Sequence, residues 1–243
     1  MGRCIYLRKG EVHTPPVVGI KAGDLPIGQI VKLMEGGVAT EFIVVNQGIP
    51  ENSSLYDASC NGTWLLRKNI KENRQWNSSN VNDYANSTIH SYLNSTFLAL
   101  FDANTQAAIK QVKLPYRAGS GYGKTVTSGS NGLSAKIFLL SSTEVNLVFG
   151  YEPTNEGACL SYFSGTEQNA TDSKRVANLN GSAAFWWLRS PYCRSDYGDT
   201  IALRVNTHGS WSFDDCPTSN GIRPCLIIPS TSIFDSTTYL LKK

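Results

Sequence analysis

Two short segments near the C-terminus constrain the fold of this chain more than any other feature. The first, residues 185–191, reads Phe-Trp-Trp-Leu-Arg-Ser-Pro, and the second, residues 221–228, reads Gly-Ile-Arg-Pro-Cys-Leu-Ile-Ile. Both combine large apolar side chains, which favour burial, with a proline that restricts the backbone. We therefore expect both segments to be buried framework. The framework residues are Trp186, Trp187, Arg189, Pro191, Gly221, Arg223 and Pro224.

The stretch between these segments, residues 192–220, has a different character. It mixes Tyr, Cys, Arg, Ser, Asp, His, Thr and Trp without a helical period. A stiff frame that holds a chemically mixed insert is a common basis for a recognition surface. The sequence therefore favours ligand binding over catalysis, although a polar surface loop without a ligand would have the same composition.

Alternation within the insert predicts a β-hairpin. Residues 200–206 alternate between aliphatic and small or polar side chains, and residues 210–213 alternate again after a turn at 207–209. The aliphatic face would pack on the core, and the other face would be presented together with the flanking loops. The residues that we expect to form the binding surface are Tyr192, Cys193, Arg194, Ser195, Asp196, Tyr197, Asp199, Ala202, Arg204, Asn206, His208, Trp211, Asp214, Asp215, Cys216, Thr218 and Ser219.

The two framework segments also resemble a known signature. Trp-Trp-Leu-Arg-Ser-Pro followed by Gly-Ile-Arg-Pro is similar to the C-terminal signature of domains from gut Gram-positive bacteria and their phages. Those domains are similar to the C-type-lectin-like variable proteins of diversity-generating retroelements. Residues 41–45, 54–64 and 157–163 resemble the framework of the same family, so the likeness covers residues 23–230.

This resemblance implies a C-type-lectin-like fold and a receptor-binding function without catalytic residues or a cofactor. It also implies that adenine-directed mutagenesis rewrites the insert. Template codons that begin with two adenines and end in a pyrimidine can yield most residue types found there, although Trp211 does not fit such a codon. The implied ligand is a host-surface protein or glycan, and the implied location is a phage tail tip or the bacterial surface.

Composition argues against several other functions. The net charge is only +3 and the basic residues are dispersed, so the sequence predicts no nucleic-acid partner. The longest apolar runs, residues 42–45 and 225–228, are too short to span a bilayer, so no membrane insertion is expected. Residues 1–10 contain three basic residues and no apolar core, so we expect no signal peptide. A homo-oligomer would suit weak individual contacts, but no motif specifies one.

The six cysteines leave an enzymatic alternative open. None lies in a Cys-x-x-Cys motif or at metal-ligand spacing from a histidine, so no metal site is predicted and reduced thiols are expected. Enzymes resembling the formylglycine-generating oxidases share the implied fold and use paired cysteines. Cys216 and Cys225 do not lie in the sequence context expected of such an active site, and Cys225 belongs to the second framework segment. A structural or interaction domain with a fixed protein partner is the other alternative.

Local patterns predict an α+β chain with many short strands and few helices. A hairpin is expected over residues 30–45, and helices are expected after the caps at 86–88 and 94–96. Residues 107–114 are ambiguous between helix and strand, and Ser141 to Glu144 reads as a capping box. The expected organisation is an N-terminal extension (residues 1–22), one ligand-binding domain (residues 23–230) and a C-terminal tail (residues 231–243).

Structural roles are expected for the framework arginines and tryptophans. Arg189 and Arg223 are predicted to be buried guanidinium groups that bind loop carbonyls or a carboxylate. Because neighbouring residues of a strand point to opposite faces, Trp186 and Trp187 would lie on different faces of one sheet, with partial exposure of one of them.

Overall fold

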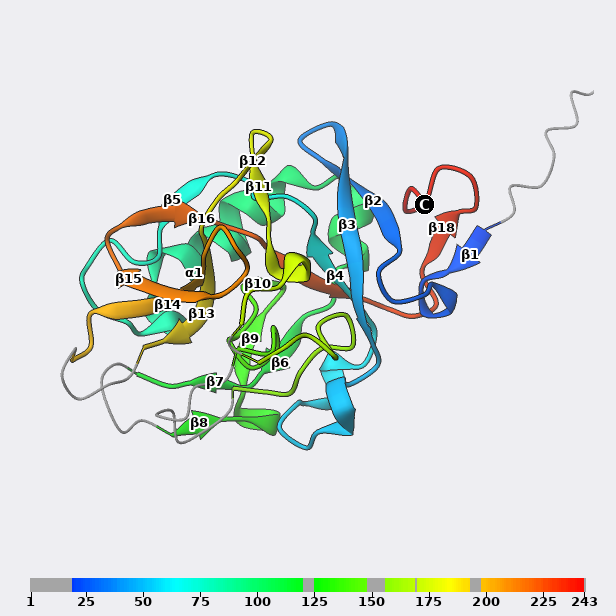
Figure 1. Cartoon of the computed structure of the whole chain (residues 1–243). Helices are drawn as coiled ribbons and strands as arrows, with labels where there is room; N and C mark the ends of the chain where they lie inside the picture. Colours follow the sequence, from blue (N-terminus) through cyan, green and yellow to red (C-terminus); the bar gives the residue numbers. More distant parts are fainter. Residues whose placement is uncertain (1–18, 120–124, 148–155, 169, 193–197, 243) are drawn as a thin grey trace, which may run out of the picture.

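The structure is a computed structural model that describes residues 19–119, 125–147, 156–168, 170–192 and 198–242. Short strands in small sheets dominate it, accompanied by a few short helices, in an α+β arrangement. Two five-stranded sheets form the body of the molecule (Figure 1). No helix in the described part of the chain is long and apolar enough to cross a membrane.

The first sheet is antiparallel throughout and contains the predicted hairpin of residues 30–45. Its strands lie in the order β10-β17-β4-β3-β2. The apolar segment 42–45 lies in β3, where it pairs with both neighbouring strands and is buried. The bounds are β2 Ile30–Glu35, β3 Val38–Gln47, β4 Thr63–Arg67, β10 Ile137–Phe138 and β17 Cys225–Ile228.

The second sheet contains the first framework segment as its central strand. Its strands lie in the order β15-β14-β13-β16-β5, and β13 pairs in parallel with β16. The bounds are β5 Asn73–Gln75, β13 Trp186–Pro191, β14 Ile201–Val205, β15 Trp211–Asp215 and β16 Ser219–Gly221. The second framework segment begins in β16 and continues as β17 of the other sheet, so it joins the two sheets.

Gly221 is required where these sheets meet. A Cβ atom on this residue would lie 2.6 Å from the carbonyl oxygen of Phe185 and 2.7 Å from Cγ2 of Ile70. Its backbone also donates a hydrogen bond of 3.0 Å to the Phe185 carbonyl. A side chain at this position would therefore separate the two framework segments.

The helical segment runs from residue 88 to residue 100 without the second cap that the sequence predicts. Ser87 caps α1 (Thr88–Tyr92), and a π-helical turn, η5 (Leu93–Phe97), and a 3-10 turn, η6 (Leu98–Leu100), follow directly. The Asn94 side chain binds elsewhere: its Nδ2 donates to Ile137 O at 2.9 Å and its Oδ1 accepts from Lys136 N at 2.8 Å. Asn94 thus ties the helix to β10.

The ambiguous segment 107–114 contains both kinds of structure. Asp102 caps α2 (Ala103–Ala108), and the chain then enters β6 (Val112–Leu114). The other strands form two-stranded ladders: β1 (Gly19–Lys21) with β18 (Ile233–Asp235), β6 with β9 (Leu133–Ala135), β7 (Tyr116–Arg117) with β8 (Val126–Thr127), and β11 (Asn178–Leu179) with β12 (Ser182–Ala183). The remaining 3-10 turns are η1 (Ala22–Asp24), η2 (Pro50–Asn52), η3 (Ala58–Cys60), η4 (Tyr84–Asn86), η7 (Gly129–Asn131) and η8 (Ser173–Arg175).

Residues 231–242 belong to the folded domain, which corrects the predicted tail. β18 pairs with β1, and Leu240 forms a bridge with Lys32 of β2. Phe234 is fully buried and Leu241 is 8% exposed. The predicted N-terminal extension likewise contributes β1 and the buried Ala22. The sequence does not indicate this packing, because the apolar residues of the segment lie in two short groups, 233–234 and 239–241, and do not alternate over a long strand.

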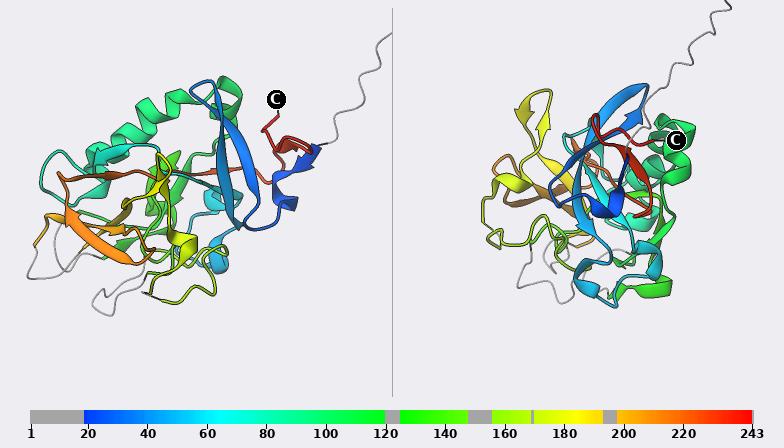
Figure 2. Two further views of the ribbon diagram at one scale, coloured as in Figure 1. Left: turned by 45° about the horizontal axis from the view of Figure 1, so that its top comes forward. Right: turned by 90° about the vertical axis from the view of Figure 1, so that its right-hand side faces the viewer.

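Two clusters of buried side chains form the core. The second sheet lies between them, so that Trp186 belongs to one cluster and Trp187 to the other. In the right-hand view of Figure 2, the helical segment 88–100 and the β11–β12 hairpin lie on opposite sides of the molecule. A sheet that is covered on both faces leaves few of its central residues exposed.

The packing of residues 231–242 can be tested with Phe234→Ala. Removal of a fully buried aromatic ring should lower the free energy of unfolding by about 3–5 kcal/mol. Val38→Ala serves as the control, because Val38 is 65% exposed and should change stability by less than about 0.5 kcal/mol. Urea denaturation measures both; equal small effects would contradict the packing of this segment.

Candidate functional site

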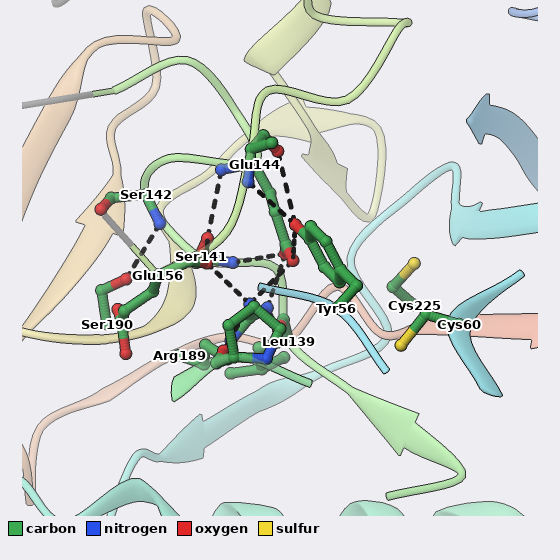
Figure 3. A network of polar contacts seen from close by, with 12 residues as sticks. Tyr56, Cys60, Leu139, Ser141, Ser142, Glu144, Glu156, Arg189, Ser190 and Cys225 are labelled. Atoms are coloured by element: carbon green, nitrogen blue, oxygen red, sulfur yellow. Dashed lines mark hydrogen bonds and ion pairs between the residues drawn. The ribbon is translucent and has the colours of Figure 1, made fainter. Parts of the chain in front are cut away.

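An ion pair between Glu144 and Arg189 lies at the centre of the buried polar network in Figure 3. Both side chains are fully buried, and the carboxylate oxygens lie 2.5 Å from Nη1 and 2.7 Å from Nη2 of the arginine. This bidentate contact fixes the orientation of both groups. Burial is the largest single influence and lowers the pKa of Arg189, but the charge and hydrogen bonds of Glu144, together with Glu156 and Tyr56, outweigh it and raise the pKa. Arg189 therefore stays charged within the core.

The guanidinium of Arg189 also binds three backbone segments. Nε and Nη2 donate to Pro115 O at 3.2 and 3.0 Å, and Nη1 donates to Leu139 O at 3.0 Å. Nη2 further donates to Glu156 O at 3.0 Å. The prediction that this framework arginine binds loop carbonyls and a carboxylate is confirmed, and β13 is thereby joined to loops from three parts of the chain.

The predicted capping box holds the carboxylate in place. Ser141 N donates to Glu144 Oε2 at 2.9 Å, and Glu144 N donates to Ser141 Oγ at 3.1 Å. The box opens a series of turns over residues 142–146 and not a regular helix. Tyr56 Oη donates to Glu144 Oε1 at 3.0 Å, and its own pKa is raised, first by burial and then by this carboxylate. We call Tyr56, Ser141, Glu144 and Arg189 the buried frame.

The framework tryptophans complete the support around β13. Trp186 Nε1 donates to Arg175 O and Trp187 Nε1 donates to Arg74 O, each at 2.9 Å. Both side chains are fully buried, so the expected partial exposure of one of them is wrong. The reason is that both faces of the second sheet are covered at this strand, and alternation moves a side chain from one core cluster to the other.

The predicted hairpin is confirmed next to this strand. β14 pairs with β13 on one side and with β15 on the other, with Leu203 opposite Phe213. The turn at residues 207–209 places Gly209 at a φ of 79°. A Cβ atom there would lie 2.0 Å from Asp172 O, so both the backbone conformation and the close approach require glycine.

One face of the second sheet carries a connected set of polar side chains from β14, β15, β16 and the turn before β16, which we call the polar face: Arg204, Ser212, Asp214, Thr218 and Asn220. Arg204 Nη1 donates to Asp214 Oδ2 and, at 2.8 Å, to Asn220 Oδ1, while its Nε donates to Ser212 Oγ at 3.3 Å. Thr218 Oγ1 donates to Asp214 Oδ1 at 3.2 Å. The side chains of Arg204 and Asp214 are 16% and 27% exposed, so their ion pair is half-buried. The structure thus brings together three of the residues predicted on the binding surface, namely Arg204, Asp214 and Thr218.

The polar face continues onto β5, which the sequence did not indicate. Asn220 is opposite Arg74 in the β16–β5 register, so these side chains share a face of the sheet. The guanidinium of Arg74 lies 3.5 Å from the ring centroid of Tyr92, and Glu72 Oε1 accepts hydrogen bonds from both residues. This part was missed because β5 and β16 are far apart in the sequence. Ser212, Asn220 and Phe185, whose ring lies 4.2 Å from Cζ of Arg204, were also left out of the predicted site.

Aromatic residues gather on the opposite face of the hairpin. The rings of Tyr192 and Phe213 stack at 4.9 Å with an interplanar angle of 6°, and Trp211 stacks on Phe213 at 6.1 Å. Trp211 and Phe213 lie in β15 at the edge of the sheet and are half-buried. They pack against the core cluster that contains Ile201, Leu203 and Val205, which confirms the predicted division of the hairpin into two faces.

Three residues predicted on the binding surface are buried, and these predictions are wrong. Ala202 and Cys216 are fully buried and Tyr192 is 4% exposed. Ala202 and Cys216 pack with Trp76 in the second core cluster, because the sheet is covered at this end on the face that was expected to be open. Tyr192 is buried by its stack on Phe213.

The other predicted residues occupy several parts of the surface. Asp199 and Asp215 are exposed at the loop end of the hairpin, and His208 is exposed at the turn at the other end. Asn206 has a structural role, because its Oδ1 accepts from His208 N at 2.9 Å and from Ser210 N at 3.0 Å. Ser219 is exposed in β16. Cys193, Arg194, Ser195, Asp196 and Tyr197 lie outside the described residues.

The environment of the cysteines bears on the enzymatic alternative. Cys216 and Cys225 are fully buried, belong to different core clusters and are free thiols, as are Cys60 and Cys159. Burial raises the pKa of Cys216 to about 12 and raises that of Cys225 as well. Within the described ranges, no group of three or more His, Cys, Asp or Glu side chains could hold a metal ion.

The importance of the buried frame can be tested with Glu144→Gln. The substitution leaves the Arg189 guanidinium buried without its counter-charge, and we expect the free energy of unfolding to fall by about 3–5 kcal/mol. The control is Glu41→Gln, which breaks an ion pair of 2.8 Å with Lys68 between side chains that are over 40% exposed. Its effect should stay below about 1 kcal/mol. Comparable losses in denaturant titrations would show that Arg189 does not depend on Glu144.

The polar face should contribute measurably to stability, whereas the exposed insert residues should not. We expect Arg204→Ala or Asp214→Ala to lower the free energy of unfolding by about 1–2 kcal/mol each, with coupling in the double variant. Combined alanine substitution of Asp199, His208, Asp215 and Ser219 should leave the melting temperature nearly unchanged. Calorimetry of the wild-type protein and of all four variants measures these effects. A larger loss of stability in the fourfold variant than in the variants of Arg204 and Asp214 would contradict the division between frame and surface.

A comparison with known families places the chain. Residues 61–230 match the sequence model of a family described as Domain of unknown function (DUF6273). The match covers well over half of the chain and includes both framework segments and the insert between them. No curated protein and no solved structure matches the chain. The chain therefore belongs to the DUF6273 family of domains.

Proposed function

We propose that this protein is a ligand-binding module in which a C-type-lectin-like scaffold carries a surface of exchangeable side chains. Its ligand would be a host-surface protein or glycan, and it would act at a phage tail tip or on the bacterial surface. No bond is made or broken in this role, and no cofactor takes part. The observation that carries the proposal is the separation between the buried frame and the insert that it supports.

This separation rests on the hydrogen bonds of the frame. The donors of Arg189 are directed to the Glu144 carboxylate and to backbone carbonyls, and the indole nitrogens of Trp186 and Trp187 are directed to carbonyls as well. None of these contacts uses the side chain of a described insert residue. The exposed residues of the insert can therefore change without the loss of a frame contact, which is what a recognition surface with variable chemistry requires.

The insert also offers suitable contact chemistry. Trp211 and Phe213 provide half-buried aromatic area on one face of the hairpin, and the polar face provides a guanidinium, a carboxylate and two hydroxyl groups on the other. Aromatic rings bring large contact area at a small cost in side-chain entropy. Together these groups favour a polar ligand with apolar parts, such as a protein loop or a glycan.

A second candidate function is an interaction domain with a fixed partner. It is favoured by the internal pairing of the polar face, because Arg204 contacts Asp214, Asn220 and Ser212 at once and cannot be exchanged alone without loss of these contacts. An oxidase-like enzyme receives less support, since Cys216 and Cys225 lie in separate clusters and burial disfavours both thiolates.

Sequencing of this gene across its native population tests the proposal. We expect substitutions to concentrate at Asp199, His208, Asp215 and Ser219 and in residues 193–197, at codons where a linked near-copy of the gene carries adenine. Ala202 and Cys216 serve as internal controls, because they belong to the insert but are buried and should stay constant. An insert as constant as residues 185–191 would overturn the proposal and favour the fixed partner.

A further inference from the structure

Four arginines of the described chain are almost completely buried: Arg117, Arg175, Arg189 and Arg223. The last three differ in how their charge is accommodated. Arg189 faces the Glu144 carboxylate. Arg175 has no ion pair with a described residue, but its Nε, Nη1 and Nη2 all donate, with acceptors that include Gly209 O at 2.6 Å, Thr166 Oγ1 at 2.9 Å and Ala170 O at 2.6 Å. Arg223 is 1% exposed, and it has neither an ion pair with a described carboxylate nor hydrogen-bond acceptors for all of its guanidinium nitrogens.

The guanidinium of Arg223 is incompletely satisfied. Its Nε donates to Arg67 O at 3.0 Å, and its Cζ lies 5.1 Å from the ring centroid of Trp186. Nη1 is buried and has no hydrogen-bond acceptor among the residues that the structure describes. No described carboxylate forms an ion pair with it either, and burial lowers its pKa to about 10. At neutral pH this group is therefore a buried cation without a counter-ion in the described part of the chain.

A surface pocket of about 380 Å³ lies against this arginine. Residues of η8 and β11 form one wall, and Ile43 of β3 and the segment after β4 contribute to the remainder. Lys174 lies at the rim, with its Nζ 5.7 Å from the ring centroid of Tyr162. Hydrogen-bonding groups in the lining come from Asn69, Ser173 and Asn178, and apolar surface comes from Ile43, Val176 and Ala177.

From this juxtaposition we propose that the pocket binds the carboxylate group of a small ligand, with Arg223 beneath the floor and Lys174 at the rim as the cationic groups. Because Nη1 is covered, the arginine acts through its charge, which is poorly screened by water at a buried position. Lys174 and the polar groups of Ser173, Asn69 and Asn178 make the direct contacts. The Tyr162 ring and the apolar wall contact the body of the ligand.

The charges around the pocket favour a group with one negative charge. Lys68 also lines the pocket, but its Nζ already contacts the Glu41 carboxylate at 2.8 Å, which leaves Arg223 and Lys174 as the unpaired cations of this site. A phosphate monoester would bring a second charge close to Glu41. The site does not include the polar face, so the proposal is independent of the proposed function of the insert.

The test uses amide NMR shifts and melting temperatures of the whole protein with three probes at constant ionic strength: acetate, N-acetylneuraminic acid and N-acetylphenylalanine. We expect all three to shift the amide signals of residues 173–178 and to raise the melting temperature, because a ligand that binds the folded state stabilises it. The sugar acid and the amino acid derivative distinguish a glycan source of the carboxylate from a peptide source. Sulfate and phosphate should bind more weakly than acetate.

Two variants with the same change in charge make the test specific. Lys174→Glu should weaken binding of the strongest probe at least tenfold, because it replaces the cation at the rim of the pocket with an anion. Lys174 is exposed, so the substitution should leave the core intact. Lys21→Glu is the matched control, since Lys21 is exposed in β1 and does not line the pocket. The proposal is overturned if no probe shifts these signals, if phosphate binds as well as acetate, or if the two variants weaken binding equally.

Discussion

The buried contact between Glu144 and Arg189 is the interaction on which the rest of this structure depends. It places one charge of each sign in the core, and each charge is costly to bury without the other. The backbone carbonyls that accept the other hydrogen bonds of the Arg189 guanidinium belong to Pro115, Leu139 and Glu156. These residues lie in segments with little regular structure of their own. A chain with so many loops is held together here by polar contacts of an ordered guanidinium as well as by apolar packing.

The same contact fixes the strand on which the hairpin of the insert is built. Arg189 lies in β13, and β14 and β15 follow β13 in the sheet, so the hairpin is built on a strand whose position the buried frame determines. Gly221 brings the second framework segment to the other side of β13. The insert therefore leaves and rejoins the frame at two fixed points, which is the physical basis for the proposed binding function.

Local patterns predicted much of this arrangement. The hairpin of residues 201–215 followed from alternation, the contacts of Ser141 with Glu144 followed from capping chemistry, and the burial of Arg189 followed from its apolar neighbours. The predictions that failed concern features that depend on contacts between distant segments of the chain. Ala202 and Cys216 lie on the face that alternation assigns to solvent, but they are buried in the second core cluster, whose other members, such as Trp76, come from distant parts of the chain. Pairing of β16 with β5, which extends the polar face to Arg74, has no local signal either. For the same reason the pocket at Arg223 could not be expected, since η8, β3 and the end of β4 meet only in the folded chain.

The central claim is that the frame folds independently of which side chains the exposed part of the insert carries. Two displayed libraries test it most directly, one randomised at Asp199, His208, Asp215 and Ser219 and the other at Trp187, Arg189, Ala202 and Cys216. Protease resistance of each member measures folding. The account predicts that most members of the first library remain resistant and that few members of the second do. Equal losses of resistance in the two libraries would contradict it, because the exposed insert residues would then belong to the fold itself.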